Sequence, residues 1–463
     1  MSRTVNIRLM MVVVFVSTFM DGLDGSIVNM AIPTMASEFG MDVSTMSWIT
    51  TSYMLTLAGL LVVFAKISTN IGPKRVMLWG LAVFTVASLL CGMSDSFETL
   101  LIFRISQGVG AAMMCSSGPI LCTENLTGKE VGTGIAVISA GSALGFAMGP
   151  GVGGMLLEVM PWNGIFLINV PLGLFMMVIT AMALPTVSNI GRAAFDWKGA
   201  VLLFVSIVSL TFGIESITSG DVMIPVVSLM VSAVTLLMFL KVERSAGEPL
   251  LNTGMFRLKG FSPVFITLLL MNAAYMGILY LTPFYCQLCM GIGVMETGLM
   301  MVVSAVVASG FSIPFGKISN RVGRRVFGIG SGLMFILSML LLLVFAEEMT
   351  LPILFASMVF KGLGWAMFGG PMGANLVEHA GEDRDMASSM MNEAYYIGAA
   401  VGTVTLAMFF SVTSSTMGID IGTISPDVFL DGFVPALVLL MVMGLVVSLL
   451  SSEVRDRMSP HNH

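Results

Sequence analysis

Charged residues are scarce in this chain: they make up 10% of its 463 residues, while apolar residues make up 56% and the mean hydropathy is +0.96. Soluble domains carry roughly 25% charged residues, so this chain has too few to cover a water-facing surface. The shortage excludes a soluble enzyme and a disordered protein. The net charge of −6, without a basic tail, excludes a protein that binds the phosphates of nucleic acid.

Histidine and cysteine are also rare, with three and five copies. The histidines lie in a loop or in the tail: His379, His461 and His463. Three cysteines fall in apolar runs and are expected to be core residues: Cys91, Cys115 and Cys122. Cys286 and Cys289 form a C-x-x-C without a second pair of ligands, so a redox or metal role is not favoured. Because a P-loop and a nucleophile–base set are also lacking, we expect neither a metal site nor an enzymatic activity.

The chain instead has long apolar runs. A membrane-spanning helix needs about 20 apolar residues, and fourteen stretches qualify: 9–31, 46–66, 76–93, 99–121, 132–156, 164–184, 198–217, 222–240, 261–284, 295–316, 326–346, 351–373, 387–411 and 429–450. The runs are continuous, unlike the alternating segments of a β-barrel. The first run contains acids and lacks an A-x-A site, so it is interpreted as a span and not a signal peptide. The predicted fold class is an all-α polytopic membrane protein.

The basic residues support an even number of spans. With a cytoplasmic N-terminus, all but two of the 21 Lys and Arg residues fall at cytoplasmic span ends or loops. The two exceptions, Arg104 and Lys361, lie within spans. The opposite joins carry acids: Glu38, Asp42, Asp95, Glu98, Glu347 and Glu348. Because positive charge stays inside, we expect a multi-pass protein of the cell membrane with both termini cytoplasmic.

Two cytoplasmic loops indicate an internal repeat. Residues 65–75 and 316–326 share Lys-Ile-Ser and a later glycine at an offset of 251 residues, and Gln107–Gly110 resembles Lys361–Gly364. Chance similarity of basic turns is the alternative, but the equivalent places of both pairs disfavour it. We therefore predict an N-terminal six-helix bundle, two additional helices and a C-terminal six-helix bundle, at residues 1–190, 191–255 and 256–463. Parallel halves with a site between them are an architecture of secondary transporters.

Several segments in order resemble one family over nearly the whole chain. They are the loop 65–75 and residues 23–33, 104–112, 141–154, 165–173 and 196–199. The chain resembles the major facilitator superfamily and, within it, the fourteen-span drug:proton antiporters of the EmrB/QacA type. The resemblance implies two parallel six-helix bundles with an inserted two-helix hairpin. It also implies that a proton gradient drives export without a cofactor.

The sequence departs from the family at three places. Thr69 and Asn320 stand where the loops usually have aspartate, and Ala65 replaces a glycine. The family's aspartate helps to lock one conformational state, so state control is expected to be weaker or differently arranged. Asp21 is an additional acid in the first span.

The charges within spans are the first candidates for function. Asp24 and Arg104 lie at similar depths in their spans, so they can pair, either as a fixed ion pair or as a proton site that Arg104 tunes. Asp21 precedes Asp24 by three residues, which puts both carboxyl groups on one helical face. Repulsion between two partly desolvated carboxylates favours binding a proton there. Asp21, Asp24 and Arg104 are therefore the predicted proton-coupling residues.

Small and basic residues are the candidates for conformational change. Glycines at steps of four form a stripe that permits close helix packing, with a proline that adds a bend: Gly141, Gly145, Gly149, Pro150 and Gly153. Ordinary helix packing is the alternative to a hinge. The repeated loops are either topology signals or a gate latch, formed by Lys66, Gly72, Arg75, Lys317, Arg321 and Gly323.

Substrate contacts are expected near the middle of the membrane. Lys361 would be costly there unless it meets an acid or an anionic group of the substrate. The other candidates are polar or aromatic: Asn29, Tyr275, Tyr280, Asn392, Glu393, Tyr395 and Tyr396. The 43 methionines suit promiscuous binding, but their spread over all spans favours general use in place of leucine.

The predicted function is proton-coupled export of amphipathic or cationic drugs, or related small molecules, by alternating access. Export of one specific metabolite and a transporter-like solute sensor are alternatives; a sensor typically needs a soluble output domain. The repeat makes a channel less favoured. The expected partners are a small-molecule substrate, protons and the lipid bilayer, with no nucleic acid and a monomeric chain.

Overall fold

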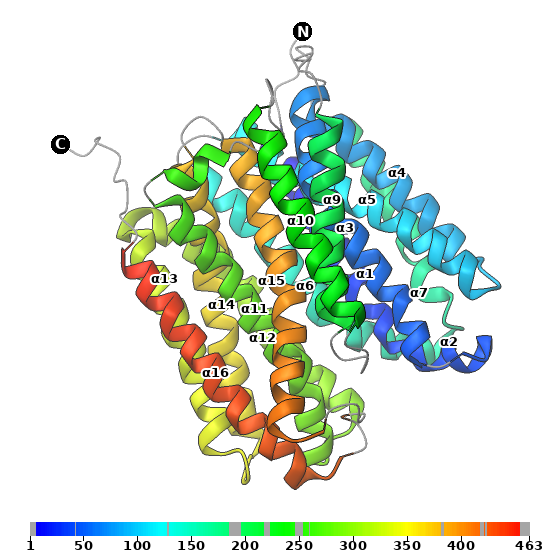
Figure 1. The fold of residues 1–463 in the computed structure, drawn as a ribbon, viewed down its shortest axis with the longest axis vertical. Helices are drawn as coiled ribbons and strands as arrows, with labels where there is room; N and C mark the ends of the chain where they lie inside the picture. Colours follow the sequence, from blue (N-terminus) through cyan, green and yellow to red (C-terminus); the bar gives the residue numbers. More distant parts are fainter. Residues whose placement is uncertain are drawn as a thin grey trace.

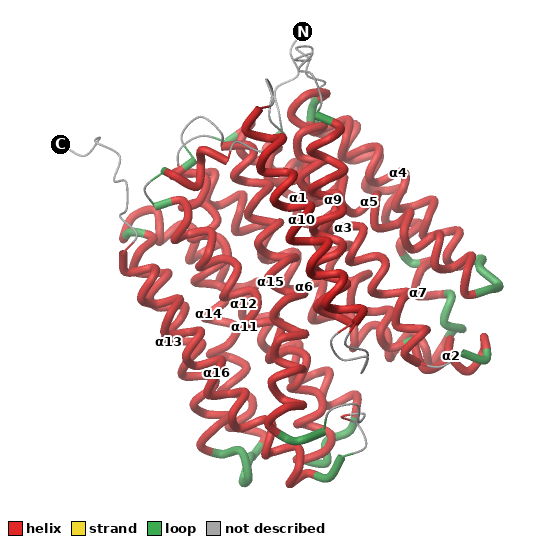
Figure 2. Tube along the Cα trace, in the orientation of Figure 1, coloured by secondary structure: helices red, strands yellow, loops and turns green. Residues whose placement is uncertain are grey.

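The protein folds as a set of long helices. The computed structural model describes residues 6–41, 43–126, 129–184, 196–216, 223–245, 253–258, 260–380, 384–416, 421 and 424–453. Within these ranges every regular element is a helix (Figure 2). The prediction of an all-α fold is therefore confirmed.

The helices follow the predicted apolar runs closely. The N-terminal elements are α1 (Ile7–Ile27), η1 (Val28–Met30), α2 (Ile32–Phe39), α3 (Val43–Ile71), α4 (Pro73–Gly92), α5 (Phe97–Asn125), α6 (Lys129–Val159), α7 (Gly164–Leu167) and α8 (Asn169–Ala183). The middle elements are α9 (Trp197–Glu215), α10 (Met223–Ser245) and η3 (Thr253–Arg257). The C-terminal elements are α11 (Phe261–Phe284), η4 (Tyr285–Cys289), α12 (Val294–Val322), α13 (Arg324–Val344), α14 (Leu351–His379), α15 (Arg384–Thr413) and α16 (Pro426–Glu453).

Every predicted span coincides with a helix, but fewer helices qualify as membrane spans on their own. Among the described residues, 12 helices are long and apolar enough to cross a membrane, and up to 13 if the bent α6 is one span. The helix α15 covers the predicted span 387–411 with 30 residues but does not qualify. The count of fourteen spans therefore stays a prediction.

The two ends of the chain repeat one packing order. In the N-terminal part α1 packs against α6, α5 packs against both α3 and α4, and α4 packs against α8. In the C-terminal part α11 packs against α15, α14 against both α12 and α13, and α13 against α16. Across the two parts, α6 contacts α12 and α14, while α3 and α5 contact α15 (Figure 1).

The helices α9 and α10 pack together at the periphery. Figure 1 shows them in front of the other helices, and α9 contacts α3 and α15. Most of α10 faces outward, with large apolar side chains exposed along its length, among them Met223, Val227, Met230, Val234 and Leu237. An apolar face of this size is costly in water, so it is explained by contact with lipid.

The repeated loops have the same backbone geometry. Gly72 joins α3 to α4 with φ 96° and ψ 133°, and Gly323 joins α12 to α13 with φ 110° and ψ 139°. A side chain would strain both positions, because only glycine adopts positive φ of this kind readily. The two glycines therefore mark structurally equivalent turns. The predicted domain boundary at 190/191 lies outside the described residues.

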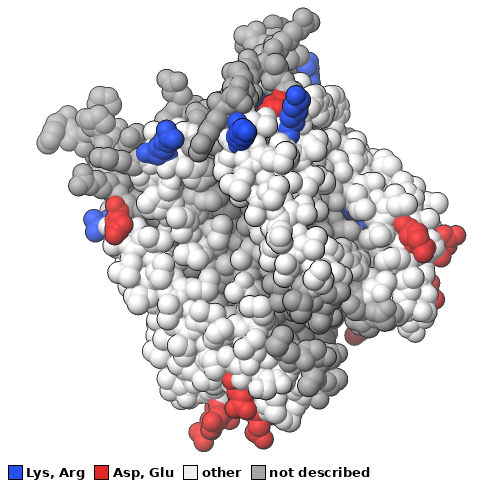
Figure 3. Space-filling view, viewed as in Figure 1, with Lys and Arg blue, Asp and Glu red and all other residues white. Residues whose placement is uncertain are grey.

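Opposite charges lie at opposite ends of the molecule. Figure 3 shows basic residues mainly at the end where α1 begins and α16 ends, and acidic clusters at the far ends of the helices. We call the helix ends that carry Lys66, Lys129, Lys198, Lys241 and Arg324 the basic end. Lys74 at this end donates hydrogen bonds to the carbonyl groups of Ala181 and Leu184, and thereby caps α8.

Candidate functional site

A polar network lies inside the N-terminal helices, around the carboxyl group of Asp24 on α1. Arg104 on α5 donates to Asp24 Oδ2 at 2.5 Å, and Gln107, one turn further along α5, donates to Asp24 Oδ1 at 2.9 Å. Asn169, the first residue of α8, donates to the same oxygen at 2.7 Å. The ion pair expected between Asp24 and Arg104 is therefore present, and both side chains are completely buried.

Further contacts hold Arg104 in place. Its Nε donates to the Ile49 carbonyl at 3.0 Å, and its guanidinium lies 4.3 Å from the centre of the Tyr53 ring. Gln107 accepts from Arg104 at 2.8 Å and donates to Ser88 at 2.8 Å. A charge inside the membrane is costly unless it is paired and hydrogen-bonded. This network explains how apolar helices can hold an arginine and an aspartate.

Asp21 lies one turn before Asp24 but has different surroundings. The Tyr53 hydroxyl donates to Asp21 Oδ1 at 2.7 Å. Asp21 also lines a cavity, whereas Asp24 is not among the residues that line it. Tyr53 contacts both environments, because its hydroxyl binds Asp21 and its ring faces Arg104. The two acids expected to act as a pair thus occupy adjoining environments joined by Tyr53.

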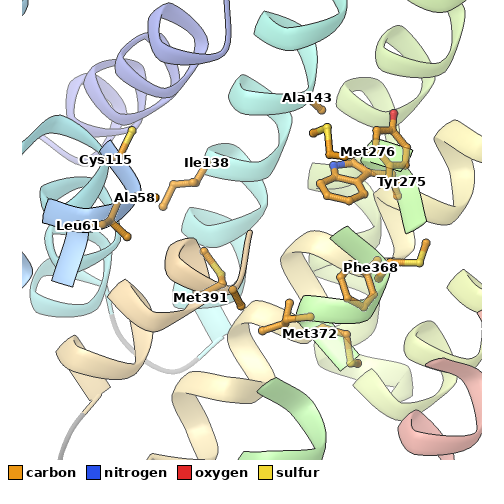
Figure 4. Close-up of a cluster of buried hydrophobic side chains, with 14 of the residues drawn as sticks. Ala58, Leu61, Cys115, Ile138, Ala143, Tyr275, Met276, Phe368, Met372 and Met391 are labelled. Carbon is orange, nitrogen blue, oxygen red and sulfur yellow. The ribbon is translucent and has the colours of Figure 1, made fainter. Parts of the chain in front are cut away.

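The cavity lies where the N-terminal and C-terminal helices meet. Its volume is about 40 Å³, which is room for a few water molecules. Asp21 and Ser142 line it from α1 and α6, and Asn272, Trp365 and Tyr395 line it from α11, α14 and α15. Figure 4 shows buried apolar side chains from both parts in this region, with Cys115 and Ile138 from the N-terminal helices and Phe368 and Met391 from the C-terminal helices. Among the residues that line the cavity, Asp21 is the acidic one.

Small residues close the cavity toward the basic end. A Cβ added to Gly370 on α14 would lie 2.7 Å from Ala136 Cβ on α6, and one added to Gly316 on α12 would lie 3.0 Å from it. Nearer the other end of α6, no described atom lies within 4 Å of a Cβ added to Gly151 or Gly154. The two parts of the chain are therefore in close contact at the basic end and looser beyond the cavity.

The predicted glycine stripe of α6 faces α1. A Cβ at Gly145 would clash with the backbone of Phe19 and Leu23, and Gly141, Gly149 and Gly153 are similarly close to α1. The helix bends by 45° between Glu130–Phe146 and Gly151–Val159, a break that contains Gly149 and Pro150. The stripe therefore brings two backbones together beside Asp21 and Asp24. Its role as a hinge stays a prediction.

Lys361 is buried and has no acidic partner among the described residues. Its side chain is 0% exposed, and its Nζ has no hydrogen-bond partner. The ammonium group lies 5.6 Å from the centre of the Tyr275 ring, which packs against Trp365 with ring centres 4.4 Å apart and ring planes tilted by 37°. Tyr395 lines the cavity and lies 6.1 Å from Trp365. The structure thus gathers Lys361, Tyr275 and Tyr395 around Trp365.

The other predicted substrate residues lie apart from this group or outside the described side chains. Asn29 is exposed in η1 and accepts from Thr50 at 3.0 Å. Tyr280 is half-buried and packs edge-on against Phe284. The side chains of three further candidates on α15 lie outside the described ones: Asn392, Glu393 and Tyr396. Cys286 and Cys289 are free thiols in η4. Cys286 is buried, and Cys289 is partly exposed.

The basic loop residues make few contacts in this state. Within the described ranges Lys66, Arg75, Lys317 and Arg321 form no ion pair. Arg324 instead pairs with Glu378 at 2.7 Å and donates to Asn320 at 3.2 Å. Asn320 also approaches Gly132 at the start of α6. The C-terminal loop thus contacts the N-terminal part through Asn320, at the position where the family has aspartate.

Sequence reasoning assigned no role to several uncharged residues of these sites. Gln107 and Asn169 complete the Asp24 network, Tyr53 links it to Asp21, and Trp365 lines the cavity one helical turn from Lys361. The signal for Gln107 was its position three residues after Arg104, which puts both on one helical face. Trp365 follows Lys361 by four residues and carries the same signal.

The family model described as "Major Facilitator Superfamily" matches residues 14–403. The chain belongs to this superfamily. It is a transporter-family protein with many membrane-spanning helices, as its fold and the match together show. The superfamily match confirms the broader part of the predicted resemblance, while the fourteen-span antiporter type stays a prediction.

Curated relatives within the superfamily cover most of the chain. The riboflavin transporter RibZ of Clostridioides difficile is 26% identical over 406 residues, which cover 87% of this chain and 88% of RibZ. The multidrug resistance protein Stp of Mycobacterium tuberculosis is 29% identical over 396 residues, which cover 84% of this chain and 73% of Stp. The multidrug transporter protein MdtP of Bacillus subtilis is 28% identical over 314 residues, 67% of this chain and 58% of MdtP.

A solved superfamily structure has the same fold. The crystal structure of the human organic anion transporter MFSD10 (TETRAN) superposes with a TM-score of 0.67 over 96% of this chain and 99% of that chain. At 16% identity the similarity concerns the fold alone.

Proposed function

We propose that the protein is a proton-coupled antiporter that exports amphipathic small molecules by alternating access. The observation that carries the proposal is the position of Asp21, the acidic residue among those that line the cavity between the two parts of the chain. A carboxyl group there can be reached from either side in turn as the two parts rock, so it can exchange protons with both solutions. The superfamily match and the multidrug-resistance relatives support transport as the broader activity.

In this proposal Asp21 carries the coupled proton and the Asp24 network fixes its surroundings. Asp24 is already bound by Arg104, Gln107 and Asn169, so it has little freedom to exchange a proton. Tyr53 transmits changes between the two environments, because it touches Asp21 and Arg104 together. A substrate that enters the cavity and displaces the Asp21 proton would couple export to proton entry.

The proposed architecture is two six-helix bundles, with α1–α8 and α11–α16 as the halves and α9–α10 as an inserted hairpin. The repeated packing order and the matching Gly72 and Gly323 turns support this arrangement. The helix α15, which lies between α11 and α3, would complete fourteen spans. We further propose that both termini are cytoplasmic, that the chain acts as a monomer in the cell membrane, and that a proton gradient alone supplies the energy.

Transport driven by an imposed pH gradient in proteoliposomes tests the proposal. Uptake or release of ethidium, riboflavin and 8-anilino-1-naphthalenesulfonate would be followed with and without the gradient. We expect at least one compound to move against its own gradient only when a proton gradient is present. In the Asp21→Asn variant the gradient should no longer accelerate transport. Equal transport rates with and without the pH gradient would contradict proton coupling.

Export of one defined metabolite is the second candidate. The presence of RibZ, a riboflavin transporter, among the relatives favours it, as do the polar groups at the cavity. Gradient-driven movement of one compound from such a panel, with no competition from the others, would distinguish this function from multidrug export.

A further inference from the structure

Lys361 is a buried cationic residue within a membrane-spanning helix. It is completely buried on α14, and its ammonium group has neither a hydrogen bond nor an ion pair with the described residues. The Tyr275 ring, at 5.6 Å, offers only a cation–π contact. An unpaired charge at this depth is costly and is typical of a functional group awaiting a partner.

A second buried donor lies on the same helix face. Trp365 follows Lys361 by four residues, and its indole Nε1 is buried without a hydrogen-bond acceptor among the described residues. A buried indole N–H normally finds an acceptor. Within the part of the chain that the structure describes, two neighbouring donors therefore lack an acceptor.

This face of α14 leads into the central cavity. Trp365, Phe368 and Gly369 all line the cavity, and Lys361 lies one helical turn before Trp365 on the same face. The Tyr275 ring packs against Trp365 and also faces the ammonium group of Lys361. A ligand entering from the cavity would meet Trp365 first, with Lys361 one helical turn beyond it.

The repeat sharpens the contrast between the two halves. The sequence match at Gln107–Gly110 makes Lys361 the counterpart of Gln107. In the N-terminal half this position belongs to a network in which a carboxylate balances Arg104. In the C-terminal half a cation stands at this position, and its nearest described partner is the ring of Tyr275.

We propose that Lys361 and Trp365 bind an anionic group of the transported solute, while the rings of Tyr275 and Trp365 contact its aromatic or apolar body. The inference rests on the transport function proposed above and adds the chemical class of the substrate. A carboxylate, sulfonate or phosphate supplies the acceptor oxygens that both donors lack. The same chemistry can come from a free solute or from the headgroup of an anionic lipid.

Binding of a matched pair of probes tests the site. 8-Anilino-1-naphthalenesulfonate and N-phenyl-1-naphthylamine share their ring systems, but only the first carries a sulfonate. Binding to the full-length protein would be measured in phosphatidylcholine nanodiscs and corrected with empty nanodiscs. We expect Lys361→Met to weaken sulfonate binding about tenfold or more and to change binding of the uncharged probe less than about twofold. Trp365→Phe should weaken sulfonate binding by a smaller factor, and Lys361→Arg should retain most of it.

Controls separate binding from folding and from lipid. Lys361→Met removes an unpaired buried charge, so it should unfold at a temperature no lower than the wild type. Nanodiscs with phosphatidylglycerol should reduce sulfonate binding more in the wild type than in Lys361→Met if a lipid headgroup occupies the site, and equally in both if the site takes a free solute. Equal sulfonate affinity in the wild type and in folded Lys361→Met would overturn the proposal. Because this assay uses no gradient, its result is independent of whether transport is proton-coupled.

Discussion

Asp21 and Asp24 are three residues apart on α1, yet they differ in what they can do. Asp24 is bound by three donors from α5 and α8 and forms the buried ion pair with Arg104. Asp21 lines the central cavity and accepts from Tyr53. A carboxyl group with many fixed donors stabilises structure, whereas one that borders a cavity can exchange protons with entering water or substrate. Replacing Asp24 with asparagine should therefore reduce stability more than the same replacement of Asp21.

Asp24→Asn should destabilise the protein by about 3–5 kcal/mol, because it leaves the Arg104 charge buried without its counterion. Thermal unfolding of the purified protein in detergent measures the loss. The double variant Asp24→Asn/Arg104→Gln should recover part of it, since neither charge remains. An unchanged unfolding temperature in the single variant would show that the ion pair contributes nothing to stability.

Asp21→Asn should change stability by less than about 1 kcal/mol. The amide oxygen of asparagine can still accept the Tyr53 hydroxyl, so the hydrogen bond to α3 is retained. The same thermal unfolding assay checks this, with Asp24→Asn as the comparison. A loss as large as that of Asp24→Asn would place Asp21 in the structural network instead of the exchange site.

Charged residues were predictable at this scale and their uncharged partners were not. Asp24 and Arg104 could be paired from the sequence because their positions along their spans put them at similar depths. Asn169 and Tyr53 gave no comparable signal, since the membrane helices are apolar on nearly all sides and their rotation cannot be read from an apolar stripe. Lys361 was recognised as costly, but its lack of an acceptor among the described residues required the structure.

At the scale of elements, the contact between α1 and α6 holds the site together. The glycines of α6 approach the α1 backbone beside Asp21 and Asp24, and Gly22 of α1 approaches Ser142 and Phe146 of α6 in return. The C-terminal half shows the same close helix packing, because Gly398 and Gly402 of α15 approach the backbone of α11. Close backbone packing of this kind replaces the hydrophobic effect as the source of helix association in a membrane.

Gly145→Ala should destabilise the protein by about 1–3 kcal/mol, the typical result of overpacking, because its methyl group would meet the backbone of Phe19 and Leu23. Gly154→Ala on the same helix is the matched control, since the space there is open. Thermal unfolding should distinguish the two variants. If both variants unfold at the wild-type temperature, the close packing of α1 and α6 does not limit stability.

At the scale of the whole molecule, the two parts of the chain are in close contact at the basic end. The start of α6 meets the ends of α12 and α14 there, through Gly132, Ala136, Gly316 and Gly370. Alternating access requires that these contacts separate when the cavity opens to this side. Locking them should therefore stop the cycle without disturbing the site.

The pair Gly132→Cys/Ala374→Cys tests this separation. A Cβ at Gly132 would lie 3.5 Å from Ala374 Cβ, within the range for a disulfide. Oxidation should arrest transport in proteoliposomes, and reduction should restore it, while each single-cysteine variant should be insensitive to oxidant. Full transport by the oxidised, cross-linked protein would mean that the basic end stays closed throughout the cycle.

The overall fold was largely predictable, because hydropathy sets the positions of the spans and basic residues set their orientation across the membrane. The matching loops at Gly72 and Gly323 also revealed the repeat, and their backbone angles agree. The sequence could not show which helices of the two halves touch, or that the cavity is closed at the basic end. Those features depend on packing between glycines far apart in the chain, for which spacing alone specifies no partner.

Substrate-induced proton release tests the central claim most directly. Purified protein in weakly buffered detergent solution, with a pH indicator, would be mixed with a compound that it transports. If Asp21 carries the coupled proton, the wild type should release protons on binding and Asp21→Asn should bind the compound without releasing them. Equal proton release from the wild type and Asp21→Asn would contradict the account.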